Sequence, residues 1–158
     1  MCSSDLQYLL AGSIEKAEGM LGRRYSIEGT VVRGDGRGKS LGYPTANIRT
    51  STDRKLVPAN GIYVVEVDVD QVQHMGMLSI GVRPTFSDHG DRTVEVNLLE
   101  FDNDLYDKSI TLTILKRLRD ELKFASAEEL VRQMHRDKEQ TLEFIADHRR
   151  TAPVARHA

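Results

Sequence analysis

The stretch Ile62–Val69, "IYVVEVDV", is followed after a short gap by Met75–Gly81, "MGMLSIG". The first segment is dominated by β-branched residues, and Asn-Gly precedes it as a turn signal. Three more segments rich in Val, Ile, Thr and Tyr complete the series: Tyr25–Arg33, Thr93–Phe101 and Ile110–Leu118. No helix-length segment separates the successive strands between Ile62 and Leu118. The series therefore predicts antiparallel pairing in a barrel or a sandwich.

Helices are expected on both sides of the strands. Asp5–Gly22 predicts two short helices, with Gly12 ending the first and Ser13 capping the second. Their apolar positions are Leu6, Leu9, Leu10, Ile14, Ala17 and Leu21. Near the other end, Ser126 and Glu129 fit a capping box before a helix. Its apolar side chains at helical spacing are Leu130, Met134, Leu142 and Ile145.

Composition restricts the class of protein. The 158 residues are 39% hydrophobic and carry a formal charge of −2, so no electrostatic argument favours nucleic acid or an anionic membrane. The single cysteine, Cys2, excludes an internal disulfide, and the five histidines lack zinc-ligand spacing. The chain shows neither a signal peptide nor an apolar run of membrane-spanning length. We therefore expect one cytoplasmic domain.

The segment Gly34–Ser40, "GDGRGKS", contains the Gly-Lys-Ser ending of a phosphate-binding P-loop without the complete pattern. The complete pattern would need a glycine at the place of Arg33, and a helix where another glycine and a proline follow. Alternating glycines can still turn successive N–H groups toward one anion, and Lys39 adds positive charge. These glycines are Gly34, Gly36 and Gly38. The alternative is a flexible hairpin tip kept soluble by its charges.

A short extended piece, Pro44–Asn47, follows the glycine segment. Thr45 and Asn47 project to the same side of such a piece, and both carry oxygen atoms that suit Mg²⁺. The alternative is that these two side chains only satisfy a turn.

Glu95 lies within Thr93–Phe101, where alternation sends Val94, Val96 and Leu98 to one face, the core. The opposite face would carry Thr93, Glu95, Asn97, Leu99 and Phe101. Its two apolar members favour a carboxylate at the border of a cleft, where it could accept a proton from a substrate hydroxyl. The alternative is a solvated glutamate on the outside of a sheet.

Six segments in order resemble the riboflavin kinase family, the flavokinase module that is often the C-terminal half of a bifunctional bacterial flavin-nucleotide synthase. They are "GTVVRGDGRGKSLGYPTANI", "PANGIYVVEV", "SIGVRPTF", "VEVNLLEFDNDLYDK", "LKRLRDELKF" and "SAEELVRQMHRD". The resemblance implies a six-stranded Greek-key barrel with a C-terminal helix, and transfer of the ATP γ-phosphate to the ribityl 5′-hydroxyl of riboflavin, giving FMN. It implies a kinase domain over 25–150, between the helical segment over 1–24 and residues 151–158, whose lack of pattern predicts a frayed tail.

The resemblance also implies roles for individual residues. Gly34, Gly36, Gly38 and Lys39 would cover ATP, whose binding Thr45 and Asn47 would share. Thr45 and Asn47 would hold the divalent cation, Mg²⁺ or else Zn²⁺ or Mn²⁺, and Glu95 would be the catalytic base. The flavin-side contacts would be Arg119, Glu121, Phe124 and Arg83.

Three positions depart from the family pattern: Asn97 replaces a frequent histidine, Asp107 a glycine, and Ser79 a frequent asparagine. Asp107 puts its turn in doubt, because a residue with a β-carbon disfavours positive φ. The N-terminal segment "CSSDLQYLLAGSIEKAEGMLGRRY" resembles the linker after an adenylyltransferase half that this chain lacks. We therefore expect FMN as the product and no FAD, with an adenylyltransferase module as a possible separate partner.

Two other functions compete with a kinase. One is a barrel that holds a flavin or nucleotide without turnover, as a carrier or sensor, and that would not need Glu95 opposite Thr45 and Asn47. The other is a small nucleic-acid-binding barrel, which the negative charge and the absence of tryptophan disfavour.

Overall fold

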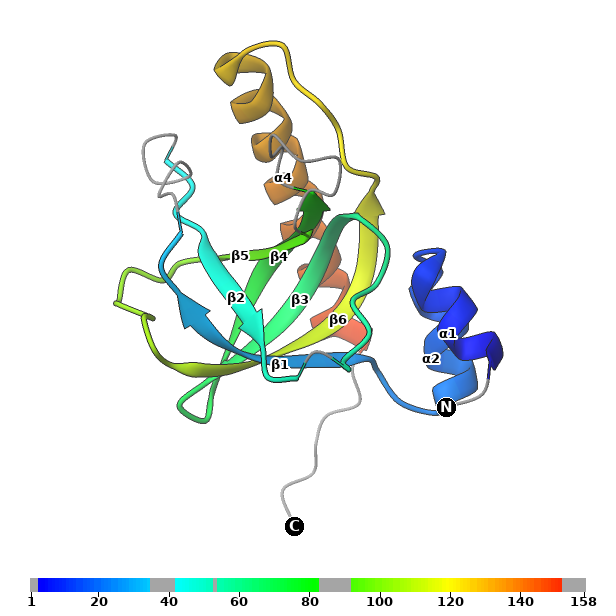
Figure 1. The fold of residues 1–158 in the computed structure, drawn as a ribbon. Coiled ribbons are helices and arrows are strands. Elements are labelled where there is room, and N and C mark those ends of the chain that lie inside the picture. Colours follow the sequence, from blue (N-terminus) through cyan, green and yellow to red (C-terminus); the bar gives the residue numbers. More distant parts are fainter. Residues whose placement is uncertain (1–2, 35–41, 53, 83–91, 152–158) are drawn as a thin grey trace. The chain divides into compact units, whose positions relative to one another are not determined.

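The structure is a computed structural model that describes residues 3–34, 42–52, 54–82 and 92–151 (Figure 1). Gly36, Gly38, Lys39 and Arg83, which the sequence nominates for binding, lie outside these residues. The chain divides into two compact units between Lys123 and Phe124. The first unit holds helices α1 (Ser3–Leu10) and α2 (Ile14–Leu21) and strands β1 (Ser26–Val32), β2 (Ala46–Thr50), β3 (Gly61–Val69), β4 (Val72–Val82), β5 (Arg92–Leu98) and β6 (Ser109–Arg119). The second holds α4 (Ala127–Thr151).

The strands close into an antiparallel barrel in the order β1-β2-β5-β4-β3-β6. β3, β4 and β5 are consecutive neighbours, and β6 returns to lie beside β3, which is the Greek-key arrangement. The predicted antiparallel barrel is therefore confirmed. The sequence had placed only Pro44–Asn47 as a short extended piece, and the structure extends it to Thr50 as β2.

Alternation along the strands builds the core of the barrel. Val94 and Val96 are buried, while Glu95 between them is partly exposed. Tyr63, Val65 and Val67 of β3 belong to the hydrophobic core in the same way, and Val64, on the opposite face of the strand, is also fully buried. Between β3 and β4, Asp70 and Gln71 both have positive φ, as a two-residue hairpin turn with the twist of the strands requires.

The predicted end of the fifth strand is wrong. β5 ends at Leu98, and Leu99 and Glu100 form a turn in which Glu100 has a φ of 54°. The Leu99 N–H still donates to the Met75 carbonyl at 2.9 Å, but the alternation stops there. Leu99 and Phe101 therefore do not extend the face of Glu95. Phe101 instead packs edge-on against His74, with ring centroids 4.9 Å apart.

The helical N-terminal segment packs into the core of the barrel unit. Leu9, Ile14 and Ala17 are buried members of the hydrophobic core, and the Leu9 carbonyl accepts a hydrogen bond from the Ala59 N–H at 3.0 Å. Gly12 separates the two helices with a φ of 74°, as predicted. Two details were wrong: Ser13 makes no side-chain capping bond, and Leu10 is 56% exposed.

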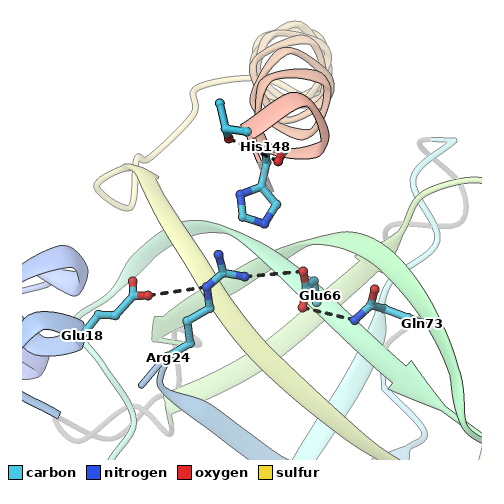
Figure 2. A network of polar contacts seen from close by, with 6 residues as sticks. Glu18, Arg24, Glu66, Gln73 and His148 are labelled. Carbon is cyan, nitrogen blue, oxygen red and sulfur yellow. Dashed lines mark hydrogen bonds and ion pairs between the residues drawn. The ribbon is translucent and has the colours of Figure 1, made fainter. Parts of the chain in front are cut away.

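A chain of polar contacts also joins α2 to the barrel (Figure 2). Arg24 lies between Glu18 of α2, at 3.5 Å, and Glu66 of β3, at 3.6 Å, and Gln73 of β4 donates to Glu66 at 3.2 Å. The Arg24 and Glu18 side chains are more than a third exposed, so these ion pairs contribute little free energy. The buried apolar contacts hold the helices in place.

The helix α4 of the second unit begins with a capping interaction. The Ser126 side chain accepts a hydrogen bond from the Glu129 N–H at 3.2 Å, as in a capping box, but Glu129 reaches back to the N–H of Ala125. Ile145 is buried, whereas Leu142 is 46% exposed and is not a packing residue as predicted. None of the described helices is long and apolar enough to cross a membrane.

Candidate active site

Asn47 and Glu95 face each other across two neighbouring strands. Asn47 of β2 pairs directly with Glu95 of β5, and Ala46 pairs with Val96. Residues directly opposite in an antiparallel pair project to the same face. Since Val96 is fully buried inside the barrel, Asn47 and Glu95 both lie on its outer face.

Thr45 completes a group of three oxygen-bearing side chains. Its hydroxyl donates to Oε2 of Glu95 at 3.4 Å, although the two residues are 50 positions apart. Thr45, Asn47 and Glu95 are all partly exposed, so a ligand can reach them. The structure thus brings together the three residues that the sequence nominates as metal ligands and base.

Gly34 places the start of the glycine segment against this group. Val32 of β1 pairs with Asn47, and the chain leaves β1 toward Gly34. A Cβ added at Gly34 would lie 1.7 Å from Nδ2 of Asn47, so the backbone there packs directly on the amide. Only glycine permits that approach.

Asn97 supports the site and was not predicted to do so. It is only 7% exposed, and its Nδ2 donates to the Pro44 carbonyl at 2.7 Å. This bond ties the residue before Thr45 to β5, the strand that carries Glu95. A polar residue two positions from Glu95 on the same face was the signal that could have revealed it.

A cavity of about 420 Å³ lies next to Thr45. Apolar side chains from β1, β2 and β5 form one side, and the 101–106 turn with its acidic residues forms the other. Its lining includes Val31, Ala46, Val96, Leu98, Phe101 and Tyr106. The sequence did not predict this cavity, because four separate segments of the chain build it.

Two contacts hold the turn at the mouth of the cavity. The Arg33 guanidinium lies over the Tyr106 ring, 5.0 Å from its centroid. The Asp107 N–H donates to the Val31 carbonyl at 2.9 Å, and Asp107 has a φ of 62°. The turn therefore keeps a positive φ at Asp107, although aspartate stands there in place of the family's glycine. Aspartate is among the residues that tolerate this conformation.

Glu121 lies on the same outer face as Glu95. Ser79 of β4 pairs with Glu95, and Gly81 is two residues further along β4 on the same side. A Cβ at Gly81 would be 2.4 Å from Oε1 of Glu121, and the Val82 N–H donates to that oxygen at 3.3 Å. One strand spacing and two residues along the strand place the backbone of Gly81, under the Glu121 carboxylate, roughly 8 Å from that of Glu95.

The other two flavin-side candidates within the described residues are Arg119 and Phe124. Arg119 ends β6, and its Nη1 donates to the Asp120 carbonyl at 2.8 Å. Phe124 belongs to the second unit, so the structure does not relate it to the site.

The oxygen donors fit a hard divalent cation. Thr45 and Asn47 offer a hydroxyl and an amide carbonyl beside the Glu95 carboxylate, a sparse set that leaves room for phosphate oxygens and water. Within the described ranges no three His, Cys, Asp or Glu side chains cluster as they would around a fully protein-bound metal.

Comparison with known sequences identifies one family. The flavokinase (riboflavin kinase) family profile matches residues 21–145. A bifunctional riboflavin kinase/FMN adenylyltransferase of Listeria monocytogenes is 39% identical over 135 residues, covering 85% of this chain and 43% of that protein. The protein of the same name from Pseudomonas fluorescens is 43% identical over 122 residues, covering 77% of this chain and 39% of its own length. The chain thus spans less than half of these curated relatives.

Solved structures agree on the fold. A crystal structure titled macrolide-efflux protein, from Streptococcus pneumoniae, superposes with a TM-score of 0.82 at 37% identity. The match covers 89% of this chain and 46% of that one. The riboflavin kinase of Trypanosoma brucei superposes with a TM-score of 0.56 at 23% identity, over 84% of this chain and 89% of that one. The second match is evidence for the fold alone.

Proposed function

This chain belongs to the riboflavin kinase family, and we propose that it transfers the γ-phosphate of ATP to the ribityl 5′-hydroxyl of riboflavin, giving FMN and ADP. The observation that carries the proposal is the convergence of Thr45 and Asn47 on Glu95 across the β2–β5 pair. A barrel that only stored a flavin or nucleotide would have no use for a base beside a cation site.

Glu95 is the proposed catalytic base. Phosphoryl transfer depends on placing the nucleophile in line and on neutralising charge on the phosphate. A carboxylate on the outer face of β5 can accept the proton of the 5′-hydroxyl and orient its oxygen toward the phosphate. Thr45 donates a hydrogen bond to this carboxylate at 3.4 Å and so restricts its orientation.

Thr45 and Asn47 are the proposed ligands of a divalent cation, with Mg²⁺ as the first choice and Zn²⁺ or Mn²⁺ as alternatives. The bound cation supplies positive charge to the phosphate oxygens. Gly34 brings the start of the glycine segment to Asn47, and that segment, with Gly36, Gly38 and Lys39, would bind the phosphates by its N–H groups and one ammonium.

The cavity beside Thr45 suits the base of the nucleotide. Its apolar walls, with Phe101 and Tyr106, can enclose a planar ring, and its position directs the attached phosphates toward Thr45 and Gly34. The triphosphate would then end at the three oxygen-bearing side chains.

Riboflavin would lie along the outer face from Glu95 toward Glu121. The roughly 8 Å along the sheet from Glu95 to Gly81, over which the Glu121 carboxylate lies, is close to the length of an extended five-carbon polyol. Leu122, the residue after Glu121, is 48% exposed and offers apolar contact to the isoalloxazine ring.

The test is an incubation with riboflavin, ATP and metal in which FMN and FAD are resolved by chromatography. FMN without FAD is the expected product, and the reaction would take place in the cytoplasm. A chain that binds riboflavin and ATP without forming FMN would instead be a carrier or sensor.

The Glu95→Gln variant tests the assignment of the base. It should retain binding of ATP and riboflavin, while kcat falls by roughly 10²–10⁴-fold, the usual contribution of a positioned base. A kcat within about twofold of wild type would remove Glu95 from this role.

A further inference from the structure

The Asn60 side chain lies between Arg92, the first residue of β5, and Glu121. Its Oδ1 accepts hydrogen bonds from Arg92 Nε at 3.2 Å and Nη2 at 3.0 Å. Its Nδ2 donates to Oε2 of Glu121 at 3.1 Å. Because a guanidinium only donates and a carboxylate only accepts, a single orientation of the amide satisfies both neighbours.

Two arginines, Arg92 and Arg117, hold the backbone around Asn60. Arg92 also donates to the carbonyls of Val57, at 3.2 Å, and Pro58, so it spans the segment that leads into β3. Arg117 of β6 donates to the Asn60 carbonyl at 2.6 Å. The amide that reaches Glu121 is therefore fixed in both position and direction.

We propose that Asn60 and Arg92 are positioning residues for riboflavin, an inference that rests on the function proposed above. They hold the Glu121 carboxylate over Gly81, on the face where the flavin would lie, and they tie it to β5. Glu95 stands three residues after Arg92 on that strand. Glu121, which would contact the flavin, and Glu95, which would activate its hydroxyl, are thereby held at a fixed separation.

The contacts are too exposed to matter chiefly for stability. The Asn60–Glu121 and Asn60–Arg92 hydrogen bonds all lie at the surface, where such bonds add little to folding. Their effect should therefore appear in binding of one substrate. Binding of ATP, on the other side of Glu95, should not change.

Asn60→Asp tests the inference, because it keeps the acceptor for Arg92 and replaces the donor to Glu121 by a second carboxylate. Repulsion should move Glu121 and raise the KM for riboflavin about tenfold, the scale of one charge-assisted hydrogen bond. The KM for ATP and the thermal midpoint should stay near wild type.

A matched control exists on the same barrel. Gln73 donates to Glu66 at 3.2 Å, also amide to carboxylate, away from Glu95. Gln73→Glu should leave both KM values unchanged. The inference fails if Asn60→Asp behaves like this control, or if it raises the KM for ATP as much as that for riboflavin.

Two further measurements keep the test decisive. If Asn60→Asp does not fold, Arg92→Lys replaces it, since lysine cannot reach the carbonyls and Oδ1 together. If the wild type forms no FMN, the proposed function fails. The dissociation constant for riboflavin, from quenching of its fluorescence, then reports directly on whether Asn60→Asp weakens binding.

Discussion

A side chain at Gly34 would overlap the Asn47 amide, so glycine at this position lets the amide lie where it does. The neighbouring atom is the end of a side chain rather than backbone, so an added methyl group would displace the amide and leave the barrel intact. Gly34→Ala should therefore resemble Asn47→Ala, with weaker metal–ATP binding and a lower rate, about tenfold in kcat/KM.

The measurement is kcat/KM for ATP as a function of metal concentration. Gly19→Ala is the control, because nothing lies within 4 Å of its added Cβ. Alanine inside helix α2 should add roughly 0.5–1 kcal/mol of stability and leave the kinetics unchanged. An unaltered metal dependence in Gly34→Ala would contradict the assignment of Asn47 as a ligand.

The residues of the site were predictable to different degrees. Alternation along Thr93–Leu98 predicts that Glu95 points away from the core, and the structure confirms it. Alternation cannot predict that β2 lies beside β5, and that pairing brings Asn47 to Glu95. The family resemblance supplied this convergence. It did not supply Asn97 or Asn60, whose roles depend on contacts with distant carbonyls and carboxylates.

Among the elements, α1 offers a sharp test because two adjacent leucines differ in burial. Leu9 is fully buried against the barrel, whereas Leu10 is 56% exposed. Leu9→Ala should lower the free energy of unfolding by about 2–5 kcal/mol, and Leu10→Ala should change it by less than about 0.5 kcal/mol.

Urea unfolding followed by circular dichroism measures both variants. A single transition that shifts with Leu9→Ala would show that the N-terminal helices fold with the barrel. Equal stability of the two variants would mean that α1 is not anchored as described.

The errors in the predicted elements have local causes. Leu99 and Phe101 continue the apolar alternation of Thr93–Leu98, and the positive φ of Glu100 that ends the strand leaves no such trace in the sequence. Leu142 has helical spacing with Ile145 and was assigned to the same face for that reason. Helical periodicity gives the side of a helix only to within a broad arc, and Leu142 falls outside it.

For the whole molecule, two buried tyrosines predict sensitivity to alkali. Burial raises the pKa of Tyr25 and Tyr63 above the ordinary value of 10.0, with nearby arginines opposing the shift. The folded state then keeps protons that the unfolded state releases, so stability is complete below pH 10 and falls as pH rises further. Burial lowers the pKa of Lys55 below its ordinary value of 10.5. Its contribution to stability therefore rises with pH just below that value, opposite to the effect of the tyrosines.

The measurement is the free energy of unfolding in urea at pH 9 and pH 11, for wild type and Tyr63→Phe. The variant should be less stable at pH 9, since it loses the 2.5 Å bond from Tyr63 to the Ala59 carbonyl. It should also lose less stability between the two pH values. Identical losses in the two proteins would rule out Tyr63 as a source of the effect.

For the molecule as a whole, the sequence indicated the class of fold but not the shape of the surface. Successive strands without an intervening helix predict an antiparallel barrel, because each must find a partner close by in the chain. The cavity beside Thr45 depends on how four segments meet after closure, from Val31 to Tyr106. No pattern within any one segment marks it.

Closure of the barrel also bears on solubility. Every described strand has a neighbour on each side, so the described barrel has no edge strand that is free along its whole length. The β2–β5 seam, with two paired positions, is the shortest of the six. Substitutions that separate β2 from β5 would expose two strand edges at once. Such a variant would then aggregate as well as lose activity.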